Sequence, residues 1–505
     1  MNFVGTWWAI IPPIFAILLA FATKKVYISL FAGCFLGALM LANFNLWATF
    51  ETLFTTMVGN IDLMILIFDV LLGMIIVLLV NSGGSAAYGN WAGKKIKTKR
   101  GALLSTSVLG CLIFVDDYFN CLTVGSVMRP VTDRYKVSRA KLAYVIDATA
   151  APVCILAPVS SWAAAVSSYI PEGYDINGFQ MYVRAIPYNF YAILTLIMVF
   201  ATSFFLFDFG KMRRNEINAQ NGDLFTVGKN EYADAGKEVV NPRAKVSDLI
   251  VPIIVLIASA VFAMIWTGMQ STGTTDIVEA FANCNASLSL VFGTFVTLIV
   301  MAIMYLPRKI ITWDFFADCL VDGFKVMVPS VSVLILAWTL KGMVDQLDIA
   351  TFVNTVFAAN SSLAAFMPML MFLVACFLGF STGTSWGTMG IMIPIAVPMF
   401  YSDSSMLTIS IAAIMAGAVC GDHISPISDT TIMSSTGAQC NHLNHVATQM
   451  QYAIVIIAIS AVMYLLAGFV HEWYIVLPIG IVVTLAVLFF LRSWSAKHDS
   501  DKAEA

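Results

Sequence analysis

The segment GALLSTSVLGCLIFVDDYFNCLTVGSVM, residues 101–128, decides how the chain is threaded. It is apolar and longer than the roughly 20 residues of a membrane span, and Asp116 and Asp117 interrupt it near the middle. Basic clusters at 94–100 and 129–141 flank its two ends. Because loops rich in Lys and Arg stay in the cytoplasm, both ends are expected on the same face. The segment is therefore predicted to enter and leave from the cytoplasm as a re-entrant helical hairpin.

The composition of the chain indicates a protein dissolved in lipid. Hydrophobic residues make up 59% of the 505 residues and charged residues only 11%, against about 25% charged residues in a soluble domain. The nine cysteines occur singly, so neither a disulfide framework nor a metal cluster is indicated. No basic face with interleaved aromatics is present, which excludes nucleic acid as a predicted partner. An all-α polytopic membrane protein is the predicted fold class.

Eleven further segments have the length and apolarity of membrane spans. If 101–128 is a hairpin, every Lys and Arg except Arg184 and Lys341 falls on one side of the membrane. This distribution predicts the N-terminus outside and the C-terminus inside. It also makes 363–399 a second hairpin, which enters from outside with its tip at 381–387. The approximate limits of the eleven spans are 5–22, 26–43, 61–81, 142–165, 186–208, 247–268, 286–305, 328–349, 406–430, 451–470 and 474–491.

The two halves of the chain match at an offset of 268 residues. Pro158, with hydroxyl residues beside it, lies over Pro426, and the tip residue Asp117 lies over Ser385. Each half has five spans and one re-entrant hairpin, and because five is odd the second half must be inverted. Inverted repeats with broken helices are typical of secondary transporters, whose sites lie mid-membrane between the repeats. The predicted domains are a first repeat at 1–208, a cytoplasmic linker at 209–246, a second repeat at 247–470, and an extra span and tail at 471–505.

The stretch GDHISPISDTT, residues 421–431, is predicted to bind a cation. Its helix is expected to break at Pro426, because proline lacks a backbone donor. Asp422, Ser428 and Asp429 supply carboxylate and hydroxyl oxygens, which suit a small hard cation, so Na⁺ is predicted there. A buried carboxylate disfavours its own ionised form and can therefore take either a proton or a cation, which is the chemical basis of exchange. The alternative for Asp429 is a structural helix cap.

Three further acids are candidates for binding an ion or a proton. Asp116 and Asp117 lie at the tip of the first hairpin, and buried acids in a membrane are functional by default. Asp147 follows the second basic cluster by a few residues. It is a candidate for carrying an ion or a proton, or for pairing with Lys141 or Arg139 near the interface.

The other candidate residues are polar groups that could contact a solute. A membrane Ser or Thr often bonds its own helix backbone instead. Asn120 could equally stabilise the tip, and His423 could be a satisfied buried histidine or a proton-linked switch. These candidates are Thr382, Gly383, Thr384, Ser385 and Trp386 at the second tip, Ser160 and Ser161 beside Pro158, Asn120 at the first tip, and His423 and Ser425 beside Asp422.

Two motifs resemble the signature of the NhaC-type Na⁺/H⁺ antiporter family. They are GDHISPISDTTIMSSTG at 421–437 and VDDYF at 115–119, and the resemblance covers roughly residues 60–470. It implies a bacterial inner-membrane protein of the ion-transporter superfamily, with two inverted repeats, an elevator-like transport domain and commonly a homodimeric state. Family members are similar to Na⁺/H⁺ exchangers, and some resemble carriers of amino acids or of malate and lactate. The resemblance implies Na⁺ and H⁺ as coupling ions and no other cofactor.

The function predicted from the sequence is sodium-coupled secondary transport. Na⁺/H⁺ antiport is the main hypothesis, and Na⁺- or H⁺-coupled transport of an amino or carboxylic acid is the alternative. A channel is disfavoured because the internal repeat replaces the rings of like residues that an oligomeric pore would need. A primary pump would need a phosphate-binding loop, which the sequence lacks. No nucleophile and base occur at a recognised spacing, so an intramembrane enzyme is not predicted.

Overall fold

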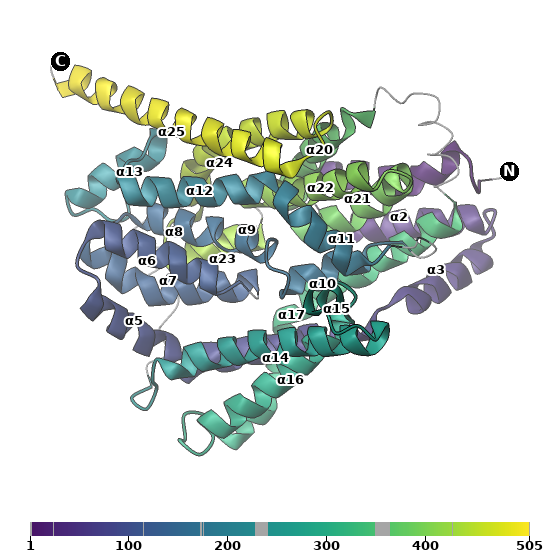
Figure 1. The fold of residues 1–505 in the computed structure, drawn as a ribbon, viewed down its shortest axis with the longest axis horizontal. Helices are drawn as coiled ribbons and strands as arrows, with labels where there is room; N and C mark the ends of the chain where they lie inside the picture. The colour runs from purple at the N-terminus through teal and green to yellow at the C-terminus, as the bar shows by residue number, and fades with distance from the viewer. Residues whose placement is uncertain are drawn as a thin grey trace.

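The computed structural model describes residues 3–23, 25–114, 116–171, 174, 176–227, 241–348, 364–426 and 428–503. Its regular elements in these ranges are all helices, with no strand among them. Most long helices run along the longest axis, and the two ends of the chain lie at opposite ends of that axis (Figure 1). Together with their apolar surfaces, this confirms the predicted all-α polytopic membrane protein.

The first half of the chain contains twelve α-helices and two short 3-10 helices in the described ranges. These are η1 (Trp7–Ile10), α1 (Ile11–Thr23), α2 (Val26–Leu41), α3 (Leu46–Asn60), α4 (Leu63–Ser82), α5 (Gly84–Lys95), α6 (Lys99–Leu112), α7 (Asp117–Arg134), α8 (Arg139–Ala148), α9 (Ala151–Cys154), α10 (Ser161–Ser168), α11 (Gly178–Ala185), η2 (Ile186–Tyr188) and α12 (Phe190–Phe205).

The second half follows after a short polar helix, α13 (Gly210–Gln220). Its helices are α14 (Ser247–Thr272), α15 (Ile277–Ala282), α16 (Ala286–Tyr305), α17 (Trp313–Gln346), α20 (Met367–Thr382), α21 (Ser385–Phe400), α22 (Ser404–Ile424), α23 (Asp429–Ala438), α24 (His442–Ala467) and α25 (Trp473–Ala503).

Seven described helical stretches are long and apolar enough to cross a membrane. They are α4, the stretch Phe190–Gln220 that contains α12, and α14, α16, α22, α24 and α25. Helix α17 is an eighth candidate if its two parts, which meet at an angle of 52°, form one span. The predicted spans near residues 5 and 26 are the shorter helices α1 and α2, of 13 and 16 residues. Helix α3 was not predicted, because Glu51 and several threonines interrupt its apolar sequence.

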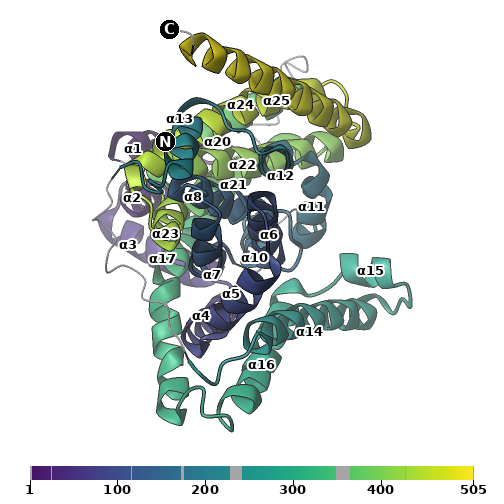
Figure 2. The same ribbon diagram turned by 90° about the vertical axis from the view of Figure 1, so that its left-hand side faces the viewer.

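Helix α22 lies at the centre of the molecule and is almost entirely buried, whereas α25 exposes most of its surface. Figure 2 shows α14, α15 and α16 projecting from one side, with α24 and α25 on the other. Helix α4 packs against both α16 and α17 and joins the projecting helices to the body. The charged residues of the centre are therefore enclosed by helices from both halves of the chain.

Helices α6 and α7 pack against each other, and the outer ends of the two lie together. The Tyr135 hydroxyl donates to the carbonyl oxygen of Ile96 at 2.7 Å, and Lys99 Nζ donates to the carbonyl oxygen of Lys136 at 3.3 Å. Lys99 also pairs with Glu216 of α13 at 2.6 Å. The basic segments that precede and follow residues 101–128 thus meet each other and the segment 209–246.

Four pairs of helices begin 268 residues apart, the offset at which the two halves of the sequence match. The pairs of first residues are Leu63 of α4 and Val331 of the second part of α17, Lys99 of α6 and Met367 of α20, Asp117 of α7 and Ser385 of α21, and Ser161 of α10 and Asp429 of α23.

Candidate functional site

The connection between α20 and α21, in the second half of the chain, is short and non-helical. We call it the second break. Gly383 ends α20 with a φ of +67°, a left-handed conformation that glycine adopts without strain. Its N–H donates to the carbonyl oxygen of Gly379. Thr384 then caps α21, because its hydroxyl accepts the N–H of Gly387 at 3.4 Å. Ser385 thereby becomes the first residue of α21, at the positive end of that helix.

Asp422 in the last turn of α22 faces this break. Ser385 donates to Asp422 Oδ2 twice, from its hydroxyl at 2.7 Å and from its backbone N–H at 3.3 Å. The Ser425 hydroxyl donates to the carbonyl oxygen of Phe380 at 2.7 Å and holds the end of α22 to α20. Asp422 is only 6% exposed, so its carboxylate sits in a buried site, where Ser385 donates two hydrogen bonds to it.

Close packing of α20 on α22 brings Asp422 to the break. A methyl group on Gly421 would lie 2.1 Å from the carbonyl oxygen of Cys376, which is far inside van der Waals contact. A methyl group on Gly417 would lie 2.4 Å from the carbonyl oxygen of Phe372. Only glycine allows the two backbones to approach this far, so the sequence GD at 421–422 serves both packing and chemistry.

The connection between α6 and α7 is the first break, the counterpart of the one between α20 and α21 in the other half. Its two acids, Asp116 and Asp117, are both 2% exposed. Ser161, at the start of α10, donates to Asp116 Oδ2 at 3.5 Å. Asp116 also lines a small apolar cavity between α4 and α14. Asp117 lies close enough to Asp422 for the two carboxyl groups to interact electrostatically. Asp117 interacts electrostatically with Asp116 as well, and Asp116 interacts with the buried Asp69 of α4.

Asn120 holds the ends of two helices of the first half together through its side-chain amide. Its amide Nδ2 lies 2.7 Å from the carbonyl oxygen of Gly110, 2.8 Å from that of Ile113 and 2.9 Å from that of Thr149. The two amide hydrogens share these three carbonyl acceptors, and the contacts tie the end of α6 to the end of α8. Of the two roles that the sequence left open for Asn120, stabilising the tip is the one these contacts favour.

Several predicted oxygen ligands form hydrogen bonds with backbone groups close to them in the chain. Ser160 and Ser428 are the N-caps of α10 and α23, and accept backbone N–H groups at 3.2 and 3.4 Å. The Thr382 hydroxyl donates within α20 to the carbonyl oxygen of Leu378 at 2.8 Å. Pro158 and Pro426 lie in the non-helical connections before these caps, as their chemistry predicts.

Of the three predicted Na⁺ ligands, the structure describes the side chains of Asp422 and Ser428. Ser428 Oγ lies 3.0 Å from the hydroxyl of Thr430 at the start of α23. The side chain of Asp429 lies outside the described residues. Within the described residues no three His, Cys, Asp or Glu side chains gather as a metal cluster. A Na⁺ ion at Asp422 would therefore need hydroxyl or backbone oxygens as additional ligands.

Two tryptophan rings, those of Trp386 and Trp162, are in contact beside the second break. The two rings meet edge to face, with centroids 6.0 Å apart. The carbonyl oxygen of Trp386 accepts the hydroxyl of Tyr169 at 3.3 Å. Because Trp162 follows Ser161, the start of α10 contacts both breaks.

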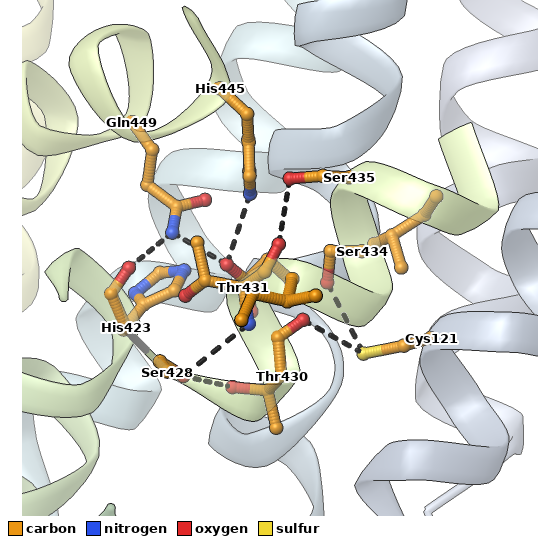
Figure 3. A network of polar contacts seen from close by, with 12 residues as sticks. Cys121, His423, Ser428, Thr430, Thr431, Ser434, Ser435, His445 and Gln449 are labelled. Carbon is orange, nitrogen blue, oxygen red and sulfur yellow. Dashed lines mark hydrogen bonds and ion pairs between the residues drawn. The ribbon is translucent and has the colours of Figure 1, made fainter. Parts of the chain in front are cut away.

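Asp147 belongs to a second buried network, and its partners His445 and Gln449 are labelled in Figure 3 together with His423. His445 Nε2 lies 3.1 Å from Asp147 Oδ2, and Gln449 Nε2 donates to the same oxygen at 2.6 Å. Gln449 also donates to the carbonyl oxygen of His423. The His423 ring is held through Nδ1 by the hydroxyl of Tyr191 at 2.7 Å. This network joins α8, α12, α22 and α24.

Neither His445 nor Gln449 was predicted as a site residue. They lie in the polar first turns of α24, which resemble an exposed loop in sequence. Their spacing of four residues places both on one face of the helix, and this was the available signal. His445 is nevertheless completely buried against α8.

The basic partners considered for Asp147 pair elsewhere. Lys141 Nζ lies 2.7 Å from Asp208 Oδ1, and the Lys141 side chain is fully buried. Arg139 pairs with Asp133 at 2.7 Å. The contacts of Asp147 are therefore made by an imidazole and an amide.

The sequence model of the Na⁺/H⁺ antiporter family matches residues 153–469. This chain belongs to that family. The matched range contains the second break and Asp422, and it begins after Asp116, Asp117 and Asp147. The resemblance found in the sequence is confirmed, and the family is one of transporters.

Two curated relatives have antiporter names, and a third, with a much longer match, is uncharacterized. Over 491 residues the chain is 37% identical to an uncharacterized protein of Haemophilus influenzae, covering 94% of this chain and 93% of the relative. It is 27% identical over 147 residues to the malate-2H⁺/Na⁺-lactate antiporter of Bacillus subtilis, covering 29% and 30%. It is 30% identical over 115 residues to an uncharacterized Na⁺/H⁺ antiporter of Haemophilus influenzae, covering 22% and 25%.

Proposed function

We propose that this chain is a sodium-coupled secondary transporter that exchanges Na⁺ for H⁺ across the bacterial inner membrane. Membership of the Na⁺/H⁺ antiporter family supports this function. The single observation that carries it is the carboxylate of Asp422, buried at a helix break and hydrogen-bonded by Ser385 at the start of α21. A buried carboxylate must bind either a proton or a cation to lose its charge. Competition of the two ions for one group gives exchange.

The proposed site has Asp422 as the residue that holds the ion, with Ser428 and Asp429 as further Na⁺ ligands. Asp117, which interacts electrostatically with Asp422, raises the negative potential that attracts a cation. Backbone carbonyls at the end of α22 supply the remaining oxygens, since the last carbonyls of a helix lack internal partners.

The proposed architecture is a pair of inverted repeats at 1–208 and 247–470, each with five spans and one re-entrant hairpin, at 101–128 and 363–399. Residues 209–246 form the cytoplasmic linker and 471–505 an extra span with a tail. The shared helix starts, 268 residues apart, support the repeat. The meeting of Ile96 with Tyr135 supports a hairpin that returns to the face it left. The N-terminus is proposed outside and the C-terminus inside.

A second candidate function is Na⁺- or H⁺-coupled transport of a small carboxylic or amino acid. The partial match to a malate-2H⁺/Na⁺-lactate antiporter favours it. In this alternative the second break, residues 382–386, and Ser161 would contact the solute with hydroxyl and backbone N–H groups.

Transport by the purified protein in proteoliposomes tests both functions. With a pH-sensitive dye inside, an outward Na⁺ gradient acidifies the lumen if Na⁺ is exchanged for H⁺. Asp422→Asn is expected to abolish this signal while the protein remains folded. The matched control is Asp403→Asn in the same helix, because Asp403 is an exposed N-cap that asparagine replaces well. Normal exchange by Asp422→Asn would refute the assignment, and labelled solute uptake without acidification would favour the second function.

A further inference from the structure

We infer that Asp147 and His445 form a proton-binding centre separate from the Na⁺ centre at Asp422, an inference that rests on the proposed exchange. Asp147 is 1% exposed and His445 is fully buried. Their Oδ2 and Nε2 atoms are 3.1 Å apart, within ion-pair distance. The two residues lie on α8 and α24, 298 positions apart in the chain, so the pair depends on the folded bundle.

The charge of Asp147 can be balanced by a proton on the histidine. The two nearby cations that the sequence offered, Lys141 and Arg139, pair with Asp208 and Asp133. An ionised carboxylate buried without a counter-charge is costly. A proton on the imidazole of His445 turns the site into a neutral ion pair and removes that cost.

The atoms of His445 are arranged for reversible protonation. A carboxylate only accepts hydrogen bonds, so Nε2 carries the hydrogen that points to Asp147. Nδ1 is then the basic nitrogen, and no hydrogen bond to it occurs among the described residues. A proton that binds at Nδ1 forms the imidazolium, and its release restores the neutral ring without breaking the bond to Asp147.

The other titratable groups around this pair come from three neighbouring helices. His423 of α22 interacts electrostatically with both Asp147 and His445. The thiol of Cys121 on α7 interacts with Asp147. Tyr191 of α12 occupies one nitrogen of His423, which leaves His445 as the imidazole in direct contact with the carboxylate.

Gln449 connects the proton centre to the Na⁺ centre. Its amide nitrogen donates to Asp147 Oδ2. It also donates to the carbonyl oxygen of His423, the neighbour of Asp422 in the chain, and Figure 3 shows this second bond. A change in the charge of the Asp147–His445 pair therefore acts on the last turn of α22. Because Asp422 extends from the same turn toward Ser385, both centres bias one structural element, which is what coupling between two sites requires.

The test measures protons released when Na⁺ is added to the purified full-length protein in weakly buffered detergent. His445→Gln keeps an N–H donor for Asp147, but its amide does not bind a proton as an imidazole does. We expect it to bind Na⁺ and to exchange Na⁺ for Na⁺ as the wild type does. We also expect it to lose the part of the Na⁺-induced proton release that His445 supplies, so that only the proton displaced from Asp422 is released, and to show a changed pH dependence of Na⁺/H⁺ exchange. The matched control is His471→Gln, in the connection between α24 and α25, which should behave as the wild type.

The possible failures are distinguishable. If the wild type neither binds Na⁺ nor exchanges it for protons, the proposed function itself is wrong. If the wild type exchanges and His445→Gln retains the full proton release and pH profile, the inference is overturned while the function stands. If His445→Gln does not fold, Asp147→Asn provides the second variant, because it keeps the shape of the carboxylate and removes its charge. The same loss of proton release is expected from it, and normal release would overturn the inference.

Discussion

Ser385 Oγ lies 2.7 Å from Asp422 Oδ2, although the two residues are 37 positions apart and on different helices. The bond fixes the end of α22 to the first residue of α21. It is charge-assisted when Asp422 is ionised, and it is joined by the backbone N–H of Ser385. The second helix break is thus part of the ion site as well as a feature of the fold.

Ser385→Ala is expected to weaken Na⁺ binding. A hydrogen bond to a charged group contributes about 1.5–3 kcal/mol, and its loss favours the protonated carboxyl over the Na⁺-bound one, so affinity should fall roughly tenfold or more. The measurement is the rise in the melting temperature of the protein with Na⁺ concentration, with K⁺ as the reference salt. The Na⁺ concentration that gives half of the full rise reports the affinity. Ser405→Ala, at the exposed start of α22, the helix that carries Asp422, is the control. An unchanged Na⁺ midpoint in the Ser385 variant would contradict this role.

Lys141→Met is expected to destabilise the fold by about 3–5 kcal/mol, because it leaves the Asp208 carboxylate buried without its cation. Adding Asp208→Asn should recover part of the loss. The exposed pair Lys325–Asp322, with side chains 69% and 46% exposed, is the comparison, and Lys325→Met should change stability by less than about 1 kcal/mol. Unfolding in detergent measures all three variants, and equal effects at Lys141 and Lys325 would argue against a buried ion pair.

Gly421→Ala is expected to separate α22 from α20, because its methyl group would lie 2.1 Å from a backbone carbonyl oxygen. Both thermal stability and Na⁺ binding should decrease, since Asp422 follows directly. Gly59→Ala in α3 is the control, because nothing lies within 4 Å of its added methyl group. A Gly421 variant that binds Na⁺ normally would show that the helices can move apart without disturbing the site.

Cysteine labelling tests the topology. In a cysteine-free background, Lys95→Cys and Arg134→Cys are expected to react with an impermeant maleimide from the cytoplasmic side. Asp403→Cys is expected to react from outside. All three positions are exposed, so burial does not limit the reaction. Labelling of positions 95 and 134 from opposite sides would rule out the first hairpin.

The positions of the helix breaks could be predicted from the sequence, whereas the contacts across them could not. Proline, glycine and hydroxyl residues mark the breaks locally, which is why Ser385 and Ser428 lie at helix starts. The partner of Asp147 depends on how α24 packs on α8, and no local pattern encodes that contact. Lys141 was a reasonable partner by proximity in sequence, yet Asp208, 67 residues away, takes it.

The glycine contact between α20 and α22 limits how this protein can move. Side chains would meet the carbonyls of α20 at Gly417 and Gly421, so rotation or sliding of one helix along the other would bring their larger neighbours into that space. Any step that opens Asp422 to the opposite side of the membrane must therefore displace the two helices together, as one rigid body. The hinges for such a step have to lie outside this pair.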